Sequence, residues 1–218
     1  MSRSKSLIVS SPPCQATLGS KSFSKTSARL TACEQYLPTT GDLVIGTIRG
    51  GTADFYYVSI ADHSTNALLP NLAFESATKK TRPILANGAL VYARVSAGLD
   101  ANKHMDATLE CVYPSTGRAD GLGPLTDGMV FGVSLGLARR LLMPRPLEDG
   151  GVAVLAELEA AGAAFETAVG RNGRVWVDAA DVRTVVAVGR ALTETDERRL
   201  DVDAQRRLAR RIIKDLSG

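Results

Sequence analysis

Lys79, Lys80 and Arg82 place three cations within four residues of the segment FESATKKTRP, residues 74–83. Cations this close together on a loop can contact successive phosphates of a nucleic acid, and small OB-type barrels bind oligonucleotides through such loops. A loop whose charges are only solvated explains the composition equally well. Two further cations, Arg49 and Lys103, are additional candidates for contact with RNA.

Phe55, Tyr56 and Tyr57 follow one another along the chain and can supply surfaces on which bases stack. Neighbouring side chains of a strand point to opposite faces. Two of the three aromatic residues therefore share a face, and at least one of them must belong to the core.

The sequence GRNG, formed by Gly170, Arg171, Asn172 and Gly173, is similar to the GxxG loop with which KH domains clamp an RNA backbone. In an RNA-binding KH domain that loop joins two helices. Here the run RVWV follows directly, and its β-branched and aromatic residues predict a strand. We therefore expect Asn172 and Gly173 at the tip of a hairpin, in a type I′ turn with positive φ at both residues, and a structural role for the whole motif.

No constellation of side chains predicts catalysis. Asp178 and Asp181 stand where a helix is expected to begin, and acids at that place are explained by capping and by the helix dipole. Asp201 and Asp203 are two residues apart, so they face away from each other on a helix. The two histidines lie far apart, and no Cys-x-x-Cys or GxxxxGK[ST] spacing occurs. We predict no catalytic residues, no metal site and no cofactor.

The composition is that of an ordinary folded chain, with 218 residues, 44% of them hydrophobic and 22% charged. No apolar run approaches the ~18 residues that cross a bilayer, and the apolar stretch near the N-terminus is too short for a secretory signal. The odd number of cysteines, Cys14, Cys33 and Cys111, favours a reducing compartment, the cytosol or the nucleus. No role is assigned to these three cysteines.

Positive charge gathers toward both ends of the chain, although the net charge is only +3. Residues 1–33 contain cations and no acid, and the C-terminal segment carries Arg198, Arg199, Arg206, Arg207, Arg210 and Arg211. Phosphate contact and a solvated helix face explain the C-terminal set about equally well.

The pattern of residues divides the chain into three parts. Residues 1–37 are rich in Ser, Thr and Lys and predict an extended arm or a short β domain. Within residues 38–114, short runs at 43–48, 55–60, 89–95 and 105–111 predict strands, the last two with strict alternation. Short strands without an intervening helix predict a closed barrel of the OB type.

Residues 115–218 alternate between strand and helix patterns and predict an α+β domain. After a Gly-rich linker at 117–123, the strands are expected at 129–134, 163–169 and 174–177, and the helices at 136–142, 150–161, 180–192 and from 200 onward. Ser134 is the expected N-cap of the first helix. The helix at 180–192 should bury Val182, Val185, Val186 and Leu192 on one face.

Five segments in a fixed order resemble a known family. They are QYLPTTGD at 35–42, AFESATKKTRP at 73–83, GRADGLG at 117–123, GLARRLL at 136–142 and GRNGRVWV at 170–177. From about residue 36 to the C-terminus the chain resembles the RNA exosome cap subunits called ribosomal RNA-processing protein 40 or exosome component 3. That family has an OB barrel of the S1 RNA-binding type followed by a KH domain, which assigns these folds to residues 38–114 and 115–218 behind a short N-terminal arm.

The resemblance implies a non-catalytic subunit of a hetero-oligomer. It would sit with other cap subunits on a ring of RNase PH-like subunits, stabilise that ring and guide single-stranded RNA to a separate 3′-to-5′ exoribonuclease, in rRNA processing and RNA degradation. The implied locations are the nucleus and nucleolus and also the cytoplasm, with no membrane contact. In this family the GxNG motif packs between the barrel and the KH domain, and we expect Trp176 to anchor the same interface.

Two other functions remain open from the sequence. A free-standing OB/KH RNA-binding factor, acting in translation or ribosome assembly, would use the same barrel without a ring. An RNA-processing enzyme in its own right is the third hypothesis. The size of the native assembly separates the first two, because a free-standing factor would elute near the 23.1 kDa of the single chain.

Overall fold

The computed structural model describes residues 36–61, 66–98, 106–143 and 152–217. The predictions for the arm at 1–35, for Lys103, for both histidines and for Cys14 and Cys33 lie outside these residues. In the described part, no helix is both long and apolar enough to cross a membrane.

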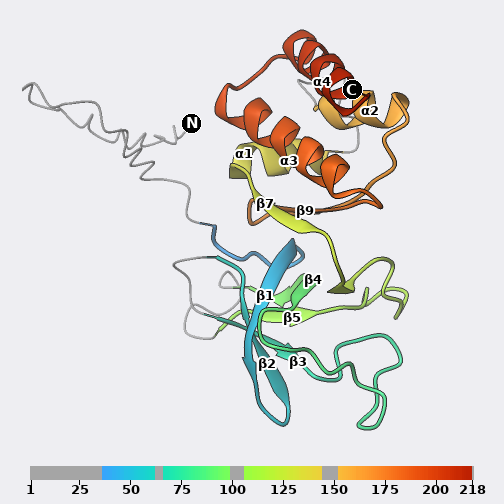
Figure 1. The fold of residues 1–218 in the computed structure, drawn as a ribbon. Helices are drawn as coiled ribbons and strands as arrows, with labels where there is room; N and C mark the ends of the chain where they lie inside the picture. The colour runs from blue at the N-terminus through green and yellow to red at the C-terminus, as the bar shows by residue number, and fades with distance from the viewer. Residues whose placement is uncertain (1–35, 62–65, 99–105, 144–151, 218) are drawn as a thin grey trace, which may run out of the picture. The chain divides into compact units, whose positions relative to one another are not determined.

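Five strands close into a barrel, shown in the lower half of Figure 1. They are β1 (Leu43–Gly51), β2 (Phe55–Ser59), β3 (Ala67–Pro70), β4 (Leu90–Ala97) and β5 (Thr108–Glu110). The strand order is β1-β2-β3-β5-β4, and pairing of β1 with β4 completes the ring. Only β3 and β5 run parallel among these pairs. This arrangement confirms the predicted OB-type barrel.

Alternation along the strands places the barrel core as predicted. In β4, Val91, Ala93 and Val95 are fully buried, and Leu109 of β5 meets them from the neighbouring strand. A strand whose apolar residues alternate with polar ones buries only one face, and the inside of the closed barrel provides the buried side of the sheet. The inward row of each strand therefore forms the core.

Two strands are absent from the sequence predictions. β3 was not recognised, and β6 (Gly123–Leu125) lies where the Gly-rich linker was expected to end. Gly123 begins β6, which pairs antiparallel with β4. The glycine-rich segment therefore joins the barrel sheet at its last residue before it leads into the second domain.

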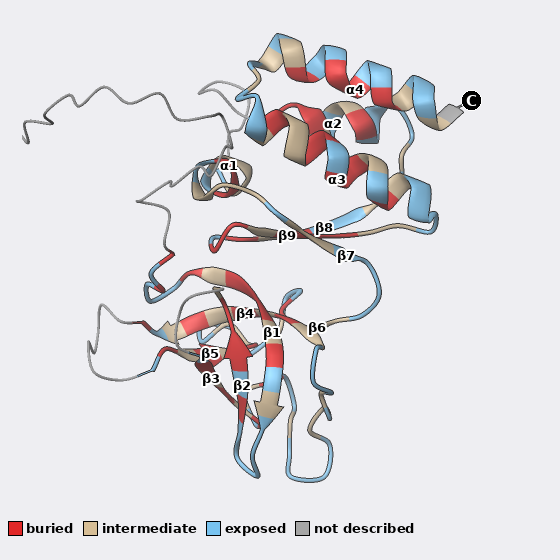
Figure 2. Cartoon of the chain, turned by 60° about the vertical axis from the view of Figure 1, so that its left-hand side comes forward, coloured by how far each residue is buried: buried red, intermediate tan, exposed pale blue. Residues whose placement is uncertain are grey.

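The second domain is a three-stranded antiparallel sheet covered by helices. Its strands β7 (Met129–Gly132), β8 (Glu166–Gly170) and β9 (Arg174–Asp178) have the order β7-β9-β8. The helices α1 (Leu135–Leu141), α2 (Val154–Ala160), α3 (Val182–Glu197) and α4 (Val202–Ser217) complete it. Figure 2 shows α2, α3 and α4 together on one side of this sheet. The α+β prediction is confirmed.

The sequence predicts the N-cap of α1 correctly and the buried face of α3 only in part. The Ser134 hydroxyl accepts a hydrogen bond from the Leu137 amide at 3.1 Å, so Ser134 is the predicted N-cap of α1. On α3 the prediction is wrong in part, because Val185 and Leu192 are buried but Val182 and Val186 are 70% and 50% exposed. The buried stripe continues instead through Val188, which lies one turn after Val185.

Candidate nucleic-acid interface

The loop that carries Lys79 and Lys80 is held in a compact turn by two threonines. The Thr78 amide donates to the Thr81 hydroxyl at 3.1 Å, the two hydroxyls are 2.8 Å apart, and the Thr81 amide donates to the Thr78 carbonyl at 3.1 Å. These bonds satisfy the backbone of the turn locally. Both lysines at its tip are exposed.

Arg82 differs from the two lysines because its guanidinium is tied to the barrel. Its Nη1 donates to the Ala53 carbonyl in the turn between β1 and β2 at 2.7 Å. Next to it, the Tyr56 hydroxyl donates to the Pro83 carbonyl at 3.0 Å. The basic loop is therefore fastened to the β1–β2 turn, and Arg82 both positions that loop and adds charge to it.

A cavity of about 580 Å³ lies where the two loops meet. It is lined by Ala53, Asp54, Phe55, Pro70, Asn71, Leu72, Lys79 and Arg82. The Phe55 side chain is 41% exposed and Tyr57 on the same face is 40% exposed, whereas Tyr56 is buried. The expected division of the three aromatic residues between surface and core is thereby confirmed.

The lining of this cavity combines one aromatic side chain with two cations. Phe55 offers an aromatic face for a base, and Lys79 and Arg82 offer positive charge for a phosphate. On the wall, the Asn71 amide nitrogen donates to the Ala53 carbonyl at 2.7 Å, while its Oδ1 is buried without a hydrogen-bond partner. Asp54 adds an acceptor for base amino groups.

The structure does not bring all the predicted cations together. Lys80 is exposed beside Lys79 but does not line the cavity. Arg49 is exposed at the irregularity of β1, where the pairing with β2 shifts between Ile48 and Gly50, and it is not part of the cavity either. The cavity therefore unites Lys79 and Arg82 with Phe55.

The GRNG motif forms the tip of the β8–β9 hairpin, but not in the predicted turn type. Gly170 pairs with Arg174, and the Gly173 amide donates to the Gly170 carbonyl at 3.1 Å. Gly173 has φ of +75°, whereas Asn172 is not among the described residues with positive φ. The loop is thus a three-residue connection with one left-handed residue, not a two-residue type I′ turn.

Asn172 is buried against the barrel by this geometry. Its amide nitrogen donates to the carbonyls of Ile45 at 2.8 Å and Ile60 at 2.7 Å. Its Oδ1 accepts from the Ile45 amide at 3.3 Å. Gly170 allows this approach, because a Cβ there would lie 2.8 Å from the Ile45 amide nitrogen. The Asn172 side chain therefore makes all three of these hydrogen bonds with the barrel backbone.

A buried acid connects the other side of the turn to the barrel. Arg171 Nη1 lies 3.0 Å from Asp42 Oδ1, and the Tyr36 hydroxyl donates to Asp42 Oδ2 at 2.9 Å. The Arg171 amide also donates to the Leu43 carbonyl at 2.7 Å. Burial, the Asp42 charge and the hydrogen bond to Asp42 raise the pKa of Tyr36, so it remains a neutral donor.

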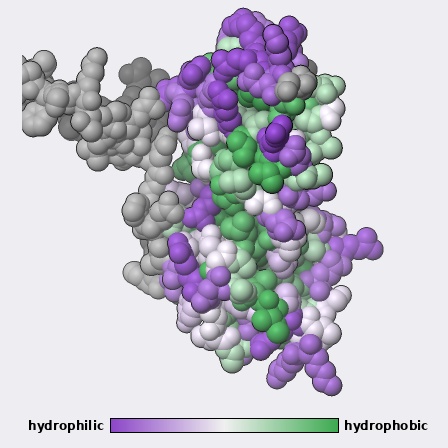
Figure 3. All heavy atoms as spheres, in the orientation of Figure 1, coloured by the Kyte–Doolittle hydropathy of each residue, from purple (hydrophilic) through white to green (hydrophobic). Residues whose placement is uncertain are grey.

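Trp176 belongs to a small apolar cluster between the two domains. It packs with Ile45 of β1 and Ala168 of β8, and its indole Nε1 donates to the Asp127 carbonyl at 3.0 Å. Tyr92 of β4 borders the same cluster, and its hydroxyl donates to the Val169 carbonyl at 3.2 Å. On the face drawn in Figure 3, hydrophilic residues gather over the helical end and hydrophobic residues are exposed beneath it.

Several interface residues were not singled out from the sequence. Asp42 stands in the segment QYLPTTGD without an assigned role, and Arg174, whose Nη1 donates to the Ser59 carbonyl at 3.0 Å, was only part of a strand. Tyr92 was an outward residue of an alternating strand. Of these three residues, only Asp42 could have been noticed in the sequence, as an acid directly before the strand predicted at 43–48.

The acids considered for catalysis are engaged in local structure. Asp181 accepts from the Arg183 amide at 3.1 Å as N-cap of α3, and Asp201 accepts from the Ala204 amide at 3.1 Å. Asp178 is the last residue of β9 rather than the first of a helix. Within the described ranges, no group of three or more His, Cys, Asp and Glu could hold a metal ion.

Known protein families match both domains. A profile of the exosome complex component RRP40 S1 domain matches residues 36–123, and a KH-domain profile matches residues 128–183. Exosome complex component RRP40 of Saccharomyces cerevisiae is 37% identical over 183 residues, which cover 84% of this chain and 72% of the relative. The chain belongs to the RRP40 family. Both the recognised family and the predicted fold class are confirmed.

Other RRP40 proteins align with smaller parts of their own length. The Schizosaccharomyces pombe relative is 41% identical over 73% of this chain and 62% of its own, and the Drosophila melanogaster relative is 40% identical over 75% and 65%. A crystal structure of a protein described provisionally as an exosome complex RNA-binding protein shares the fold, with a TM-score of 0.64, 22% identity, and coverage of 84% of this chain and 99% of that one. Membership of the RRP40 family favours the exosome over a free-standing factor.

Proposed function

We propose that this chain is a non-catalytic, RNA-binding cap subunit of the RNA exosome. It stabilises a ring of RNase PH-like subunits together with other cap subunits, and it guides single-stranded RNA toward a 3′-to-5′ exoribonuclease in rRNA processing and RNA degradation. The observation that carries this proposal is the RRP40 match across the S1 barrel and onward, 37% identical over 183 residues. Its places of action are the nucleus and nucleolus and also the cytoplasm.

The geometry supports different roles for the two domains, with RNA contact at the barrel and attachment of the domains to each other at the GRNG turn. The Asn172 side-chain amide is hydrogen-bonded to the barrel backbone, so the GRNG turn fixes the domains to each other instead of clamping RNA. The cavity beside Phe55, with Lys79 and Arg82 at its rim, remains open to a passing strand. Aromatic stacking and phosphate contacts bind any sequence, which suits a subunit that handles many RNAs.

The absence of catalytic activity is part of the proposal, and it has a direct test. We expect the purified chain, freed of ring subunits, to leave a 5′-labelled RNA intact with Mg²⁺, Mn²⁺ or inorganic phosphate. Asp181 and Asp201 cap helices, Glu194 pairs with arginines, and no group of three or more His, Cys, Asp and Glu in the described part of the chain could hold a metal ion. Shortening of the RNA that persists through purification and is lost on Asp178→Asn or Asp201→Asn would contradict this expectation.

The assembly itself is tested by native size exclusion with mass spectrometry. A tagged copy of the full chain is expected to elute from a cell extract at several times 23.1 kDa, together with RNase PH-like proteins. Elution near the mass of one chain, without such proteins, would favour a free-standing factor and reject the proposal.

A further inference from the structure

A second surface, remote in sequence from the basic loop, lies between the first turns of α3 and the last turns of α4. A groove of about 450 Å³ opens there. Its apolar lining includes Val182, Val186, Ile212 and Leu216. Ile212 belongs to the helical core, whereas Val182 and Val186 are the two valines that the helical pattern wrongly assigned to the core. The groove thus exposes apolar surface on a helix pair that is otherwise highly charged.

Positive charge borders this groove. Arg183 and Arg190 both line it, against the one lining acid, Asp215. A partner that covers the two valines would bring its own side chains next to the two guanidiniums. Carboxylates at the edge of such a partner would find planar donors that favour bidentate contact.

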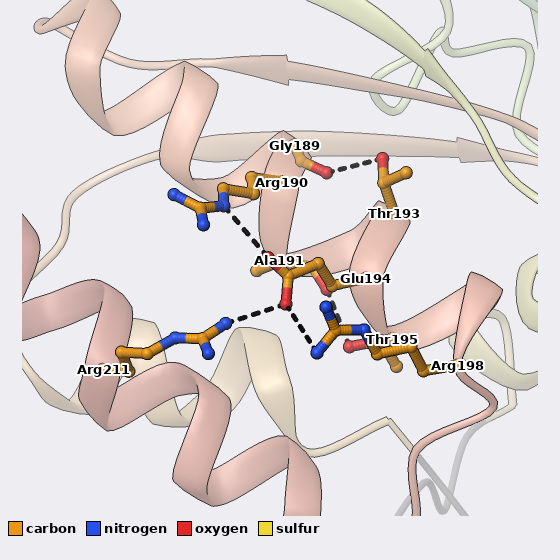
Figure 4. Close-up of polar contacts among 8 residues, drawn as sticks. All are labelled: Gly189, Arg190, Ala191, Thr193, Glu194, Thr195, Arg198 and Arg211. Carbon is orange, nitrogen blue, oxygen red and sulfur yellow. Dashed lines mark hydrogen bonds and ion pairs between the residues drawn. The ribbon is translucent and has the colours of Figure 1, made fainter.

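Arg190 also belongs to a cluster of arginines around one acid of α3, which Figure 4 shows. Arg190, Arg198 and Arg211 converge on the single carboxylate of Glu194, at 3.0, 3.6 and 2.8 Å. Desolvation alone would raise the pKa of Glu194, but the hydrogen bond from Arg190 and the charges of Arg211, Arg198 and Arg190 lower it. One carboxylate therefore balances three guanidiniums that are each about half exposed and keep donors for further acceptors.

We propose that this groove binds an acidic segment of a partner protein that inserts aliphatic side chains over Val182 and Val186. Such a segment combines apolar anchors with Asp or Glu at the rim, as an amphipathic helix in a groove does. The proposal is independent of exosome assembly, because it rests only on the surface of α3 and α4.

Charge and side-chain type disfavour three other occupants of this groove, namely residues 1–33, a second copy of the chain and RNA. Residues 1–33 of this chain hold cations and no acid, so they would be repelled by Arg183 and Arg190. A second copy would bring the same arginines face to face with these. RNA would satisfy the charge, but the groove lining contains no aromatic side chain on which a base could stack.

Fluorescence anisotropy of the full chain with two labelled synthetic peptides tests this proposal. Each peptide has about 14 residues with leucines at i, i+4 and i+7, one with glutamates between them and the other with lysines. We expect only the acidic peptide to bind. Val186→Glu and Arg183→Glu should each weaken its binding by about tenfold or more, since one removes an anchor contact and both add repulsion.

Two matched variants control for the general effect of the substitutions. Ile84→Glu makes the same aliphatic-to-acid change at a barrel residue that is 92% exposed. Arg207→Glu reverses a charge on α4 about 140° around the helix from Ile212. Both should bind the acidic peptide as the wild type does. Equal binding of the two peptides, wild-type binding by both groove variants, or a loss of oligo(U) binding on Arg183→Glu with no loss of peptide binding would each overturn the proposal.

Discussion

Replacing Asn172 with Ala should loosen the interface between the barrel and the KH domain rather than weaken RNA contact directly. The substitution removes three buried hydrogen bonds, to the Ile45 carbonyl, the Ile45 amide and the Ile60 carbonyl. At about 1 kcal/mol for each bond, the expected loss in free energy of unfolding is about 3 kcal/mol. For a chain of this size each kcal/mol lowers the Tm by about 2–4 °C, so the Tm should fall by about 6–12 °C.

Thermal unfolding of the full chain, followed by circular dichroism, measures this effect, with oligo(U) anisotropy below the transition as the second readout. Asn87→Ala is the matched control, because Asn87 is exposed in a barrel loop and its loss should change the free energy of unfolding by less than about 0.5 kcal/mol. If Asn172→Ala has the Tm of the wild type but binds RNA more weakly, the structural role is wrong and the turn is an RNA clamp.

Three further predictions concern the core, the basic loop and alkaline pH. Trp176→Ala should destabilise the protein by about 3–5 kcal/mol in urea unfolding, because the buried indole packs between the domains, and wild-type stability of this variant would contradict the assigned burial. Gly173→Val should also lower the Tm and reduce co-purification with a ring. The double variant Lys79→Ala with Lys80→Ala should flatten the slope of log affinity for oligo(U) against log salt by up to about 1.4, and an unchanged slope would mean that the loop does not contact phosphates. Burial and then the Glu110 charge raise the pKa of the Cys111 thiol to about 12, and burial and then Tyr113 raise that of Tyr92 to about 12. Because these folded-state pKa values lie above the unfolded ones, the stabilisation is complete below about pH 9 and is lost toward pH 12. The free energy of unfolding of Cys111→Ala should therefore fall less steeply between pH 9 and 11 than that of the wild type. Equal slopes for the variant and the wild type would contradict this.

The strands that sequence predicted are those whose pattern is local. Residues 89–95 alternate over seven positions, which fixes the inward face of β4 without knowledge of its neighbours. β3 has only four residues, ends at Pro70, and pairs with β2 and β5. β6 contains Gly123 and Pro124 and is a strand only because β4 lies beside it. Short strands that depend on distant partners leave no local period to find.

The candidate site shows the same limit. Lys79 and Lys80 were found because charge density is visible in the sequence. The bond from Arg82 to the Ala53 carbonyl spans 29 residues, and the bonds from Asn172 to the Ile45 backbone span 127. Sequence placed Asn172 at a hairpin tip, but the partner of its side chain depends on how the two domains pack. On α3, valines at 182, 185, 186 and 188 cover too many faces for the pattern alone to select the buried one.

Ultraviolet crosslinking of RNA in the native assembly, with the crosslinked peptides of this chain mapped by mass spectrometry, shows which domain of this chain contacts RNA. A cap subunit that guides RNA with its barrel should co-purify with RNase PH-like proteins and crosslink around Phe55 and Lys79, and not at residues 170–178, which include the β8–β9 turn. Crosslinks concentrated at Arg171 and Asn172, or an RNA-bound assembly in which the barrel never crosslinks, would contradict the account.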